Sequence, residues 1–467
     1  MSLDTGLELG FRSVEREHAG ERVPVEGHLP DWLDGALLRN GPARFDVGGE
    51  RVAHWFDGLG MLTRFGIDGA ADEVVYANRF LRSEAYRTAT EEGRLPSQFG
   101  SGGSWLRRVY DLLAGTTTDN CNVHVARLDG TGVALTEVPR YVAFDGETLA
   151  TDGEFAFEDD LSGSVNTAHL VPDPHRGETV GLLTDYRERA YRLYRVPDGS
   201  RRRRLVAELE AGKPAYVHSF AVGSDHVVLT EHPFVVDPRS FLTPGGEGFV
   251  DFFDWEPGRG TTFHVIDRET GAVVAAPTAD PFFVFHHVNA FEVDGEIVVD
   301  LVAYPDSSVV SGLYLDDVRA WFEDGVDGEL RRYRIPLDGG DAAAETLYDG
   351  VELPRVAAGD RTRRHRYVFG QGAAEADGNH LAKVDVASET ATRWAEPGTF
   401  VEEPVFVRAP GVEPPADGGV VLATALNANE ERTDLLVVDA GSMDLLARAP
   451  LPHAIPFGFH GRYAPGG

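Results

Sequence analysis

Short hairpin signals recur along the whole chain, and they constrain its fold more than any other feature. In each signal an apolar, β-branched run meets an Asp, a short polar turn and a second apolar run. Clear copies lie at residues 265–271, 383–388 and 437–442, with looser copies at 144–146 and 292–295. The Asp side chain can accept hydrogen bonds from its own turn, so each copy predicts a hairpin.

Repeated hairpins without long helical blocks between them are typical of an all-β propeller. A large array of β-sandwiches would also produce hairpins and is the alternative. No shift in composition marks a linker, so the sequence predicts one domain over residues 1–467.

The chain is strongly acidic. Its 467 residues carry 43 Lys and Arg against 76 Asp and Glu, a net charge of −33. Such a surface repels phosphates, which disfavours a role in binding nucleic acid. Disorder is also disfavoured, because 42% of the residues are hydrophobic and apolar runs recur throughout. The remaining interpretation is a folded protein adapted to a salt-rich cytoplasm, where screening weakens self-repulsion.

Targeting signals and disulfides are not expected. Cys121 is the single cysteine, so no intramolecular disulfide can form, which fits a reducing compartment. The first 22 residues lack a basic region followed by an apolar stretch, and no run approaches the roughly 18 apolar residues of a membrane span. We therefore expect a cytoplasmic protein.

Two apolar segments stand apart from the hairpins. Residues 104–114 place Trp105, Leu106, Val109, Leu112 and Leu113 at helical spacing, which predicts a short amphipathic helix. Residues 234–255 gather Phe and Trp side chains in a Pro- and Gly-rich stretch. Both segments are interpreted either as ordinary core or as a patch for peripheral membrane contact that collects an apolar substrate.

Four of the sixteen histidines lie in apolar or tightly turned segments: His169, His218, His286 and His460. Taken singly, such a histidine is more often a satisfied core residue than a ligand. They are 49, 68 and 174 residues apart, which matches no local zinc motif. A propeller, however, brings the inner strands of distant blades to one axis, where neutral imidazoles could share an iron, copper or zinc ion.

Three glutamates inside apolar segments are candidates to orient such ligands: Glu137, Glu352 and Glu403. A ligating imidazole usually donates its second N–H to a carboxylate, and a buried carboxylate is costly without such a partner. The alternative for each is a glutamate on an edge strand facing water.

Together with these segments, several further motifs resemble the carotenoid cleavage oxygenase family. They follow the family's order along nearly the whole chain, and they lie at residues 35–42, 54–61, 76–82, 118–123 and 457–461. The resemblance implies a seven-bladed β-propeller whose loops and helices form a cap and an apolar tunnel over an axial metal site.

The resemblance also implies roles for individual residues. His169, His218, His286 and His460 would be the catalytic centre and would ligate Fe(II). Glu137, Glu352 and Glu403 would accept hydrogen bonds from the last three, leaving His169 without a glutamate. His287 falls in a variable position beside the ligand position of His286, His54 lies in a family motif but not at a ligand position, and His124 has no assigned role.

The implied reaction is the cleavage of a conjugated double bond by O2 to give two carbonyl products, such as retinal or apocarotenals. The sequence contains no Ser-His-Asp or Gly-rich phosphate motif that would point to other chemistry. The protein would supply the metal, a dry tunnel and the register of the double bond.

The family also contains stilbene-cleaving enzymes, which tend to carry a lysine before the first of these glutamates. That position is Thr136 here, and Lys213 and Lys383 are the only lysines in the chain. The sequence therefore favours an apolar polyene as the partner of O2. An isomerase on the same metal and a metal-free propeller used as a binding module are further alternatives, and the sequence gives no oligomeric state.

Overall fold

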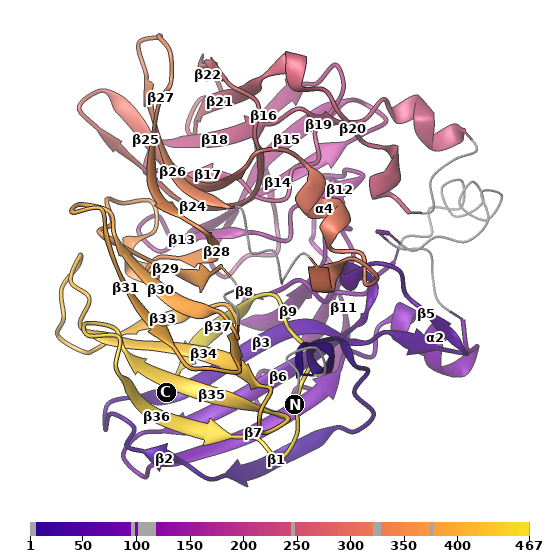
Figure 1. The fold of residues 1–467 in the computed structure, drawn as a ribbon. Helices are drawn as coiled ribbons and strands as arrows, with labels where there is room; N and C mark the ends of the chain where they lie inside the picture. The colour runs from indigo at the N-terminus through magenta and orange to yellow at the C-terminus, as the bar shows by residue number, and fades with distance from the viewer. Residues whose placement is uncertain are drawn as a thin grey trace.

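Seven β-sheets arranged in a ring make up the molecule (Figure 1). The computed structural model describes residues 6–94, 99–100, 118–243, 248–320, 328–373 and 377–466. Within these ranges, each of the seven sheets has four to six strands, and two further sheets are two-stranded ribbons. The predicted seven-bladed β-propeller is therefore confirmed.

The blades follow one another along the chain. The axial strand is β37 (Gly461–Pro465) in blade 1 and β32 (Thr399–Val401) in blade 7, and in each of the other blades it is the first strand in sequence. Blade 1 contains β37 (Gly461–Pro465), β3 (Asp34–Arg44), β6 (Leu59–Asp68), β7 (Glu73–Phe80) and β1 (His18–Val23). Blade 2 contains β8 (His124–Leu128), β9 (Thr131–Leu135), β10 (Tyr141–Phe144) and β11 (Thr151–Phe155). Blade 3 contains β12 (Val165–Asn166), β13 (Val171–Asp173), β14 (Glu178–Asp185), β15 (Ala190–Pro197) and β16 (Arg204–Glu210).

The remaining four blades repeat this plan. Blade 4 contains β17 (Ala221–Val222), β18 (His226–Glu231), β21 (Thr261–Asp267), β22 (Val273–Ala275) and β23 (Thr278–Ala279). Blade 5 contains β24 (Phe283–Val293), β25 (Glu296–Tyr304), β26 (Glu329–Pro336) and β27 (Ala343–Asp349). Blade 6 contains β28 (Val351–Arg355), β29 (Tyr367–Gly372), β30 (His380–Asp385) and β31 (Thr390–Ala395). Blade 7 contains β32 (Thr399–Val401), β33 (Val405–Arg408), β34 (Gly419–Asn427), β35 (Arg432–Asp439), β36 (Leu445–Pro450) and β2 (Glu26–Gly27).

The ring is closed twice, by strands from opposite ends of the sequence. β37 pairs with β3 inside blade 1, with Leu37 opposite Tyr463. β2 pairs with β36 at the outer edge of blade 7, with Glu26 opposite Arg448. Figure 1 shows the result as yellow and indigo strands lying side by side. Each closure joins N-terminal to C-terminal residues through backbone hydrogen bonds, so the two ends of the chain are tied into the same blades.

Most of the predicted Asp turns are confirmed. The carboxylate of Asp267 accepts from the backbone N–H groups of Glu269 and Thr270 at 3.0 and 2.7 Å. Asp145, Asp385 and Asp439 accept from their own turns in the same way. Asp294 differs: it and Gly295 form a two-residue turn with φ of 51° and 83°, in which the left-handed backbone itself makes the hairpin.

Apolar layers fill the space between neighbouring blades, and the largest apolar cluster lies under the connecting segments. That cluster joins Phe11, Trp55, Phe253 and Phe457 to Phe283 and Phe285 of β24.

The helical segments are η1 (Glu8–Phe11), η2 (Trp55–Asp57), α2 (Glu84–Glu91), η3 (Pro238–Leu242), η4 (Val250–Phe252), η5 (Pro257–Arg259), α4 (Ser308–Gly312) and η6 (Ala358–Asp360). The ribbons are β4 (Asp46–Val47) with β5 (Glu50–Arg51), and β19 (Phe234–Val235) with β20 (Asp254–Trp255).

The two apolar segments singled out in the sequence have different outcomes. The predicted helix at 104–114 lies outside the described residues. In the second segment, Phe234, Val250 and Phe253 are buried in the largest cluster, so most of its described part is core. Leu242, at the end of η3, is 61% exposed. Among the described residues, no helix is both long and apolar enough to cross a bilayer.

Candidate metal centre

The four predicted histidines meet on the propeller axis, each from a different blade. His169 follows β12 in blade 3, His218 precedes β17 in blade 4, His286 lies within β24 in blade 5, and His460 directly precedes β37 in blade 1. These elements are the axial strands of their blades, so residues up to 291 positions apart (460 − 169) become neighbours.

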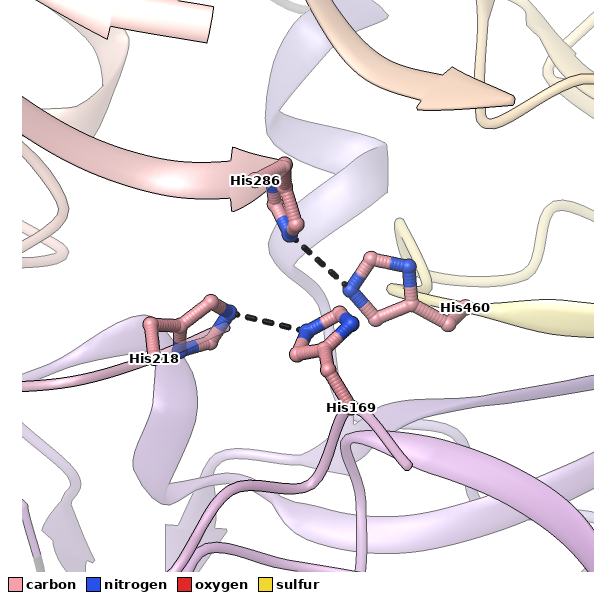
Figure 2. Close-up of side chains that lie close together, drawn as sticks. All are labelled: His169, His218, His286 and His460. Atoms are coloured by element: carbon pink, nitrogen blue, oxygen red, sulfur yellow. Dashed lines mark hydrogen bonds between the residues drawn. The ribbon is translucent and has the colours of Figure 1, made fainter. Parts of the chain in front are cut away.

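Figure 2 shows the four imidazole rings turning nitrogen atoms toward a common point. Nε2 of His169 lies 3.0 Å from Nε2 of His218, and Nε2 of His286 lies 3.3 Å from Nε2 of His460. One nitrogen from each of the four rings lies within 4.8 Å of each of the others. His218 and His460 are buried, and His169 and His286 are half-buried.

At a bulge in β24, His286 points into the four-histidine cluster and the adjacent His287 does not. Between Val284 and His287 the strand carries one residue more than β25 opposite, which breaks the alternation and re-aims the side chains. His287 points the other way, with Nδ1 2.8 Å from the hydroxyl of Ser219 and Nε2 2.8 Å from the hydroxyl of Thr230. Both ring nitrogens of His287 therefore contact hydroxyl groups outside the four-histidine cluster.

His54 also points elsewhere. Its Nε2 lies 3.2 Å from the carbonyl oxygen of Val310, and its Nδ1 accepts from the N–H of Phe56 at 3.2 Å. This ring therefore braces η2 against α4 and is separate from the four-histidine cluster.

Three carboxylates contact the outer nitrogens of three of the histidines. Glu137 Oε1 lies 2.6 Å from Nδ1 of His218, and Glu352 Oε2 lies 2.6 Å from Nδ1 of His286. Glu403 Oε1 lies 2.7 Å from Nδ1 of His460. In the described part of the chain, no carboxylate contacts His169. The structure therefore brings together all seven residues chosen from the sequence, with the pairing expected of them.

A further set of side chains holds these glutamates, and none of it was identified from the sequence. The hydroxyl of Tyr216 donates to Glu137 at 2.8 Å, and that of Tyr304 donates to Glu352 at 2.8 Å. Tyr216 stands two residues before His218 on the same segment, a spacing that puts both side chains on one face. That alternation is the only signal in the sequence that could have found it.

Glu403 has more hydrogen-bond and ion-pair partners than Glu137 or Glu352. Arg355 Nε lies 2.8 Å from its Oε1, and Arg39 Nη1 lies 3.3 Å from its Oε2. The backbone N–H of Gly461 donates to Oε2 at 2.7 Å. A Cβ at position 461 would lie 2.7 Å from the carbonyl oxygen of Leu38 and from Cδ of Arg39, so only glycine allows the chain to pass here.

Glu352 is aimed by local backbone distortion. The pairing of β28 with β29 slips between Glu352 and Arg355, and Leu353 takes a left-handed φ of 48°. Such a conformation is costly for a branched side chain and persists where the surroundings determine it. Here it turns the carboxylate of Glu352 out of the strand and onto His286.

The donor arrangement fits a metal ion. His286 and His460 each direct Nδ1 at a carboxylate, which holds the proton on Nδ1 and leaves Nε2 as a bare lone pair. Two lone pairs 3.3 Å apart repel each other unless a cation lies between them. Imidazole nitrogens about 2.1 Å from one ion lie roughly 3.0 Å apart at right angles and roughly 4.2 Å apart across it. The observed separations match that range.

Burial favours the neutral form of three of the four imidazoles. Burial lowers the pKa of His169 and of His460 well below the usual value, and the neighbouring histidines add to the effect. Burial also lowers the pKa of His218, although Glu137 opposes it. Neutral imidazole is the form that binds a metal.

Aromatic side chains cover one side of the cluster. The ring of Phe285 lies 5.1 Å from that of His218, and the ring of Phe56 lies 6.4 Å from it in a stacked orientation. Phe459 and Phe99 extend this wall, with their rings 5.0 and 5.2 Å from that of Phe56. These rings make this side of the four-histidine cluster apolar.

No lysine lies at the centre. Thr136, next to Glu137, is buried. The chain's two lysines are engaged in ion pairs elsewhere, Lys213 with Glu256 and Lys383 with Asp417.

A seven-bladed propeller with four histidines on its axis, three of them contacted by carboxylates, defines a fold with a candidate site for one metal ion. Residues 11–465 match the family model described as retinal pigment epithelial membrane protein. The chain is 33% identical to carotenoid cleavage dioxygenase 8 homolog A, chloroplastic, of Oryza sativa subsp. japonica, over 97% of this chain and 87% of that one. It therefore belongs to the carotenoid cleavage oxygenase family.

Other members of the family and a solved structure are also similar to this chain. The chain is 30% identical to a mitochondrial carotenoid-cleaving dioxygenase of Macaca fascicularis, over 97% of this chain and 93% of the relative. It is 29% identical to the beta,beta-carotene 15,15'-dioxygenase of Rattus norvegicus, over 95% of this chain and 89% of the relative. A cobalt-substituted structure of Synechocystis apocarotenoid oxygenase superposes with a TM-score of 0.87 at 25% identity, over 100% of this chain and 99% of that one.

Proposed function

We propose that this protein is a dioxygenase that cleaves a conjugated double bond of a carotenoid or apocarotenoid with O2. The observation that carries the proposal is the cluster of four neutral imidazoles beside an aromatic wall. Each carbonyl product takes one oxygen atom, so both atoms of O2 end in the products. The names of the rice, macaque and rat relatives support the same reaction class.

We propose Fe(II) as the metal and His169, His218, His286 and His460 as its ligands. Four neutral ligands leave the full charge of a divalent ion uncompensated in the inner sphere, and imidazole suits iron as well as other transition metals. When bound, iron would supply the binding and activation of O2. Cobalt in the Synechocystis relative supports a site that accepts a divalent transition metal.

The protein's own groups act around that ion. Glu137, Glu352 and Glu403 hold the tautomers of three ligands, which fixes ring orientation and raises basicity. Phe56, Phe285 and their aromatic neighbours contact the polyene and exclude water. No side chain is required to act as nucleophile or to carry a proton, because the reaction adds O2 and releases no leaving group.

A polyene is favoured over a phenolic stilbene. A stilbene phenol would need a polar partner in the apolar approach, and the position before Glu137 is threonine. With Lys213 and Lys383 both paired elsewhere, the described site offers no cation to a phenolate. An apolar polyene needs only the aromatic wall.

We further propose that the enzyme works in the cytoplasm of a salt-adapted cell and touches membranes at their surface. The net charge of −33 supports the first statement, because high salt screens its self-repulsion. Leu242, exposed at the end of η3 beside the half-buried Phe241, supports the second.

One experiment tests the reaction. Iron-loaded protein is incubated with β-carotene, an apocarotenal or a hydroxystilbene under ¹⁸O2, and the products are identified by mass spectrometry. We expect labelled aldehydes or ketones from at least one polyene and none from the stilbene. Absence of labelled carbonyl products from both polyenes would refute the proposed reaction, and a labelled stilbene product would refute the substrate preference.

A further inference from the structure

A small cavity lies between blades 1 and 7. Blade 1 contributes Arg39 of β3 and Thr63 of β6 to its wall, and blade 7 contributes Glu402, directly after β32, and Thr424 of β34. Arg39 and Thr63 are opposite each other in the pairing of β3 with β6, so their side chains lie on the same face of the sheet. The cavity is therefore lined by polar groups from both blades.

The cavity has room for one water molecule. About 20 Å³ of it is open to the centre of a water-sized sphere. One buried water needs roughly 10–15 Å³ by the same measure. The cavity therefore fits a ligand with one heavy atom and is too small for a ligand with several.

The carboxylate of Glu402 is hydrogen-bonded through one oxygen only. Its Oε2 accepts from Nη2 of Arg39 at 2.6 Å, from the hydroxyl of Thr424 at 2.9 Å and from the N–H of Gly458 at 3.3 Å. Within the described chain, Oε1 has no hydrogen-bond partner, although Glu402 is only 4% exposed. A buried carboxylate oxygen without a donor costs free energy.

The guanidinium of Arg39 has an unpaired donor beside the same carboxylate. Its Nη1 donates to the carbonyl oxygen and the carboxylate of Glu403 at 3.1 and 3.3 Å, and its Nη2 donates to Glu402. No acceptor among the described residues meets its Nε–H, and Arg39 is only 3% exposed.

These two unpaired groups belong to one ion pair. In a guanidinium, the N–H of Nε is parallel to one N–H of Nη2, and a carboxylate commonly accepts both with its two oxygens. Glu402 accepts from Nη2 alone, with Oε2. The Nε–H of Arg39 and the Oε1 of Glu402 therefore remain as a donor and an acceptor at the wall of the same cavity.

We propose that one water molecule is bound in this cavity and bridges Arg39 and Glu402. The water accepts from Nε–H of Arg39 and donates to Oε1 of Glu402, which completes the two-point contact between guanidinium and carboxylate. The hydroxyl of Thr63 lines the same cavity and forms no hydrogen bond to another described residue, so it is the third partner. Buried waters typically make about three hydrogen bonds.

The charges around the cavity select a neutral ligand. A cation bound here would lie against the guanidinium of Arg39, and an anion would lie against the carboxylate of Glu402, so either ion meets a like charge. The unpaired groups are one donor and one acceptor. A water molecule satisfies both at once, because it accepts and donates hydrogen bonds.

The water also supports the four-histidine cluster through Arg39. A guanidinium is planar, so partners on Nε, Nη1 and Nη2 together fix its orientation. Arg39 contacts Glu403, whose Oε1 lies 2.7 Å from Nδ1 of His460. Loss of the water therefore loosens the carboxylate that orients His460. This consequence rests on His460 as a proposed metal ligand, whereas the water site itself does not.

A crystal structure tests the water site directly. Crystals of the full-length protein are grown with rubidium chloride as the salt, and data are collected at the rubidium edge. We expect a peak of water density within hydrogen-bond distance of Nε of Arg39 and Oε1 of Glu402, without anomalous signal. An empty cavity, or an anomalous peak that marks a monovalent cation, would overturn the proposal.

Position 63 offers a matched pair of variants. Thr63→Ile replaces the hydroxyl by a longer apolar branch and is expected to fill the cavity and remove the water. Thr63→Ser keeps the hydroxyl and is expected to keep the water. Density for the water in Thr63→Ile at undiminished height would overturn the assignment of Thr63 as a partner. If Thr63→Ile does not fold, Thr63→Val removes the hydroxyl with little change in shape and is expected to weaken the peak.

A titration without turnover tests the effect on the metal centre. Co²⁺ binding is followed by its absorption spectrum in the wild type, in Thr63→Ile and in Thr392→Ile, which makes the same change at an exposed position of β31. We expect the Kd for Co²⁺ to rise several-fold in Thr63→Ile, less than the roughly 10- to 100-fold typical of losing a direct partner of a ligand. Thr392→Ile should leave the Kd unchanged. An unchanged Kd in Thr63→Ile would overturn the support of His460 by the water, whichever substrate the enzyme cleaves.

Discussion

Nε2 of His286 lies 3.3 Å from Nε2 of His460, and hydrogen bonds to Glu352 and Glu403 keep the protons of both rings on the opposite nitrogens. The contact is therefore between two lone pairs. Without a cation this arrangement is repulsive, and with one it becomes two coordinate bonds. The folded protein is thus built around a charge that its own side chains do not provide.

Removal of the metal should therefore destabilise the protein. A ligand present at 100 times its Kd stabilises the folded state by about 2.7 kcal/mol, and a chelator removes that contribution. Differential scanning calorimetry should show a lower Tm after chelation and recovery when Fe(II) is restored. His218→Ala should lose this response, whereas His28→Ala, whose side chain is 90% exposed, should retain it. An equal response in both variants would contradict the four-histidine site.

Glu403→Gln should be more damaging than Glu352→Gln. Glu403 is buried with Arg39 and Arg355, and Arg39 keeps its pair with Glu402, so removing the charge of Glu403 leaves Arg355 without its carboxylate at a cost of about 3 to 5 kcal/mol. Glu352 has a tyrosine partner in place of an arginine, and its replacement should mainly weaken metal binding, by about 10- to 100-fold. Urea unfolding and metal titration of both variants measure the two effects. A similar loss of stability in both would show that the arginine pairs contribute little.

Tyr216→Phe should weaken the centre without disturbing the core. It removes the hydroxyl that donates to Glu137, a bond worth about 0.5 to 1.5 kcal/mol, and leaves the ring in place. Metal affinity should fall several-fold. Tyr186→Phe is the matched control, because the buried hydroxyl of Tyr186 has no partner among the described residues. Equal metal affinity in Tyr216→Phe and the wild type would remove Tyr216 from the support of Glu137.

Acid should weaken the contact between blades 4 and 5 through Glu292. Burial raises the pKa of this carboxyl group, but hydrogen bonds from His226 and from the N–H groups of Asp225 and Ser224 outweigh burial and lower the pKa from 4.5 to about 2. A depressed pKa means that the stabilisation is complete above pH 4.5 and is lost as the pH falls toward 2.

The corresponding variant is Glu292→Gln. It should lose roughly 2 to 3 kcal/mol relative to the wild type at neutral pH and progressively less in acid. Urea unfolding of both proteins at neutral pH and at about pH 3 gives the difference. A difference that stays constant over this range would show that Glu292 does not titrate as described.

Leu242→Asp should reduce binding to membranes if η3 touches them. The side chain is 61% exposed, so the substitution should leave stability within about 0.5 kcal/mol of the wild type. Flotation with liposomes measures binding. Leu205→Asp, at a 52% exposed position on β16, is the control, because it introduces the same charge elsewhere. Equal flotation of the two variants would exclude η3 as the contact.

The sequence was informative where a local pattern has a local physical cause. The Asp turns at Asp145, Asp267, Asp385 and Asp439 were predictable because a carboxylate and its turn are a few residues apart. The convergence of the four histidines was not visible in their spacings; the predicted propeller made it possible, and the family resemblance implied it. Two features had no such signal: the bulge that separates His286 from His287, and the roles of Arg39 and Arg355.

Contacts between residues far apart in the sequence were not predicted, because no local pattern marks them. Arg39 reaches Glu403 across 364 residues, and the side chain of Asn289 donates to the carbonyl oxygen of Asp360 across 71. Nothing near either residue marks its partner. Asp294 was assigned the wrong kind of turn, because an Asp-Gly pair serves both a side-chain cap and a left-handed hairpin, and only the register of β24 with β25 distinguishes them.

The strand that closes the ring also follows directly after the last of the four histidines. His460 leads into β37, and β37 completes blade 1 by pairing with β3, which the ribosome made some 400 residues earlier. A nascent chain therefore carries three of the four histidines while the 174 residues from His286 to His460 are made, with no finished pocket in which to place a metal. Translation must pass residue 460 before the four histidines can meet, so the capture of a metal by all four is an event of the finished chain.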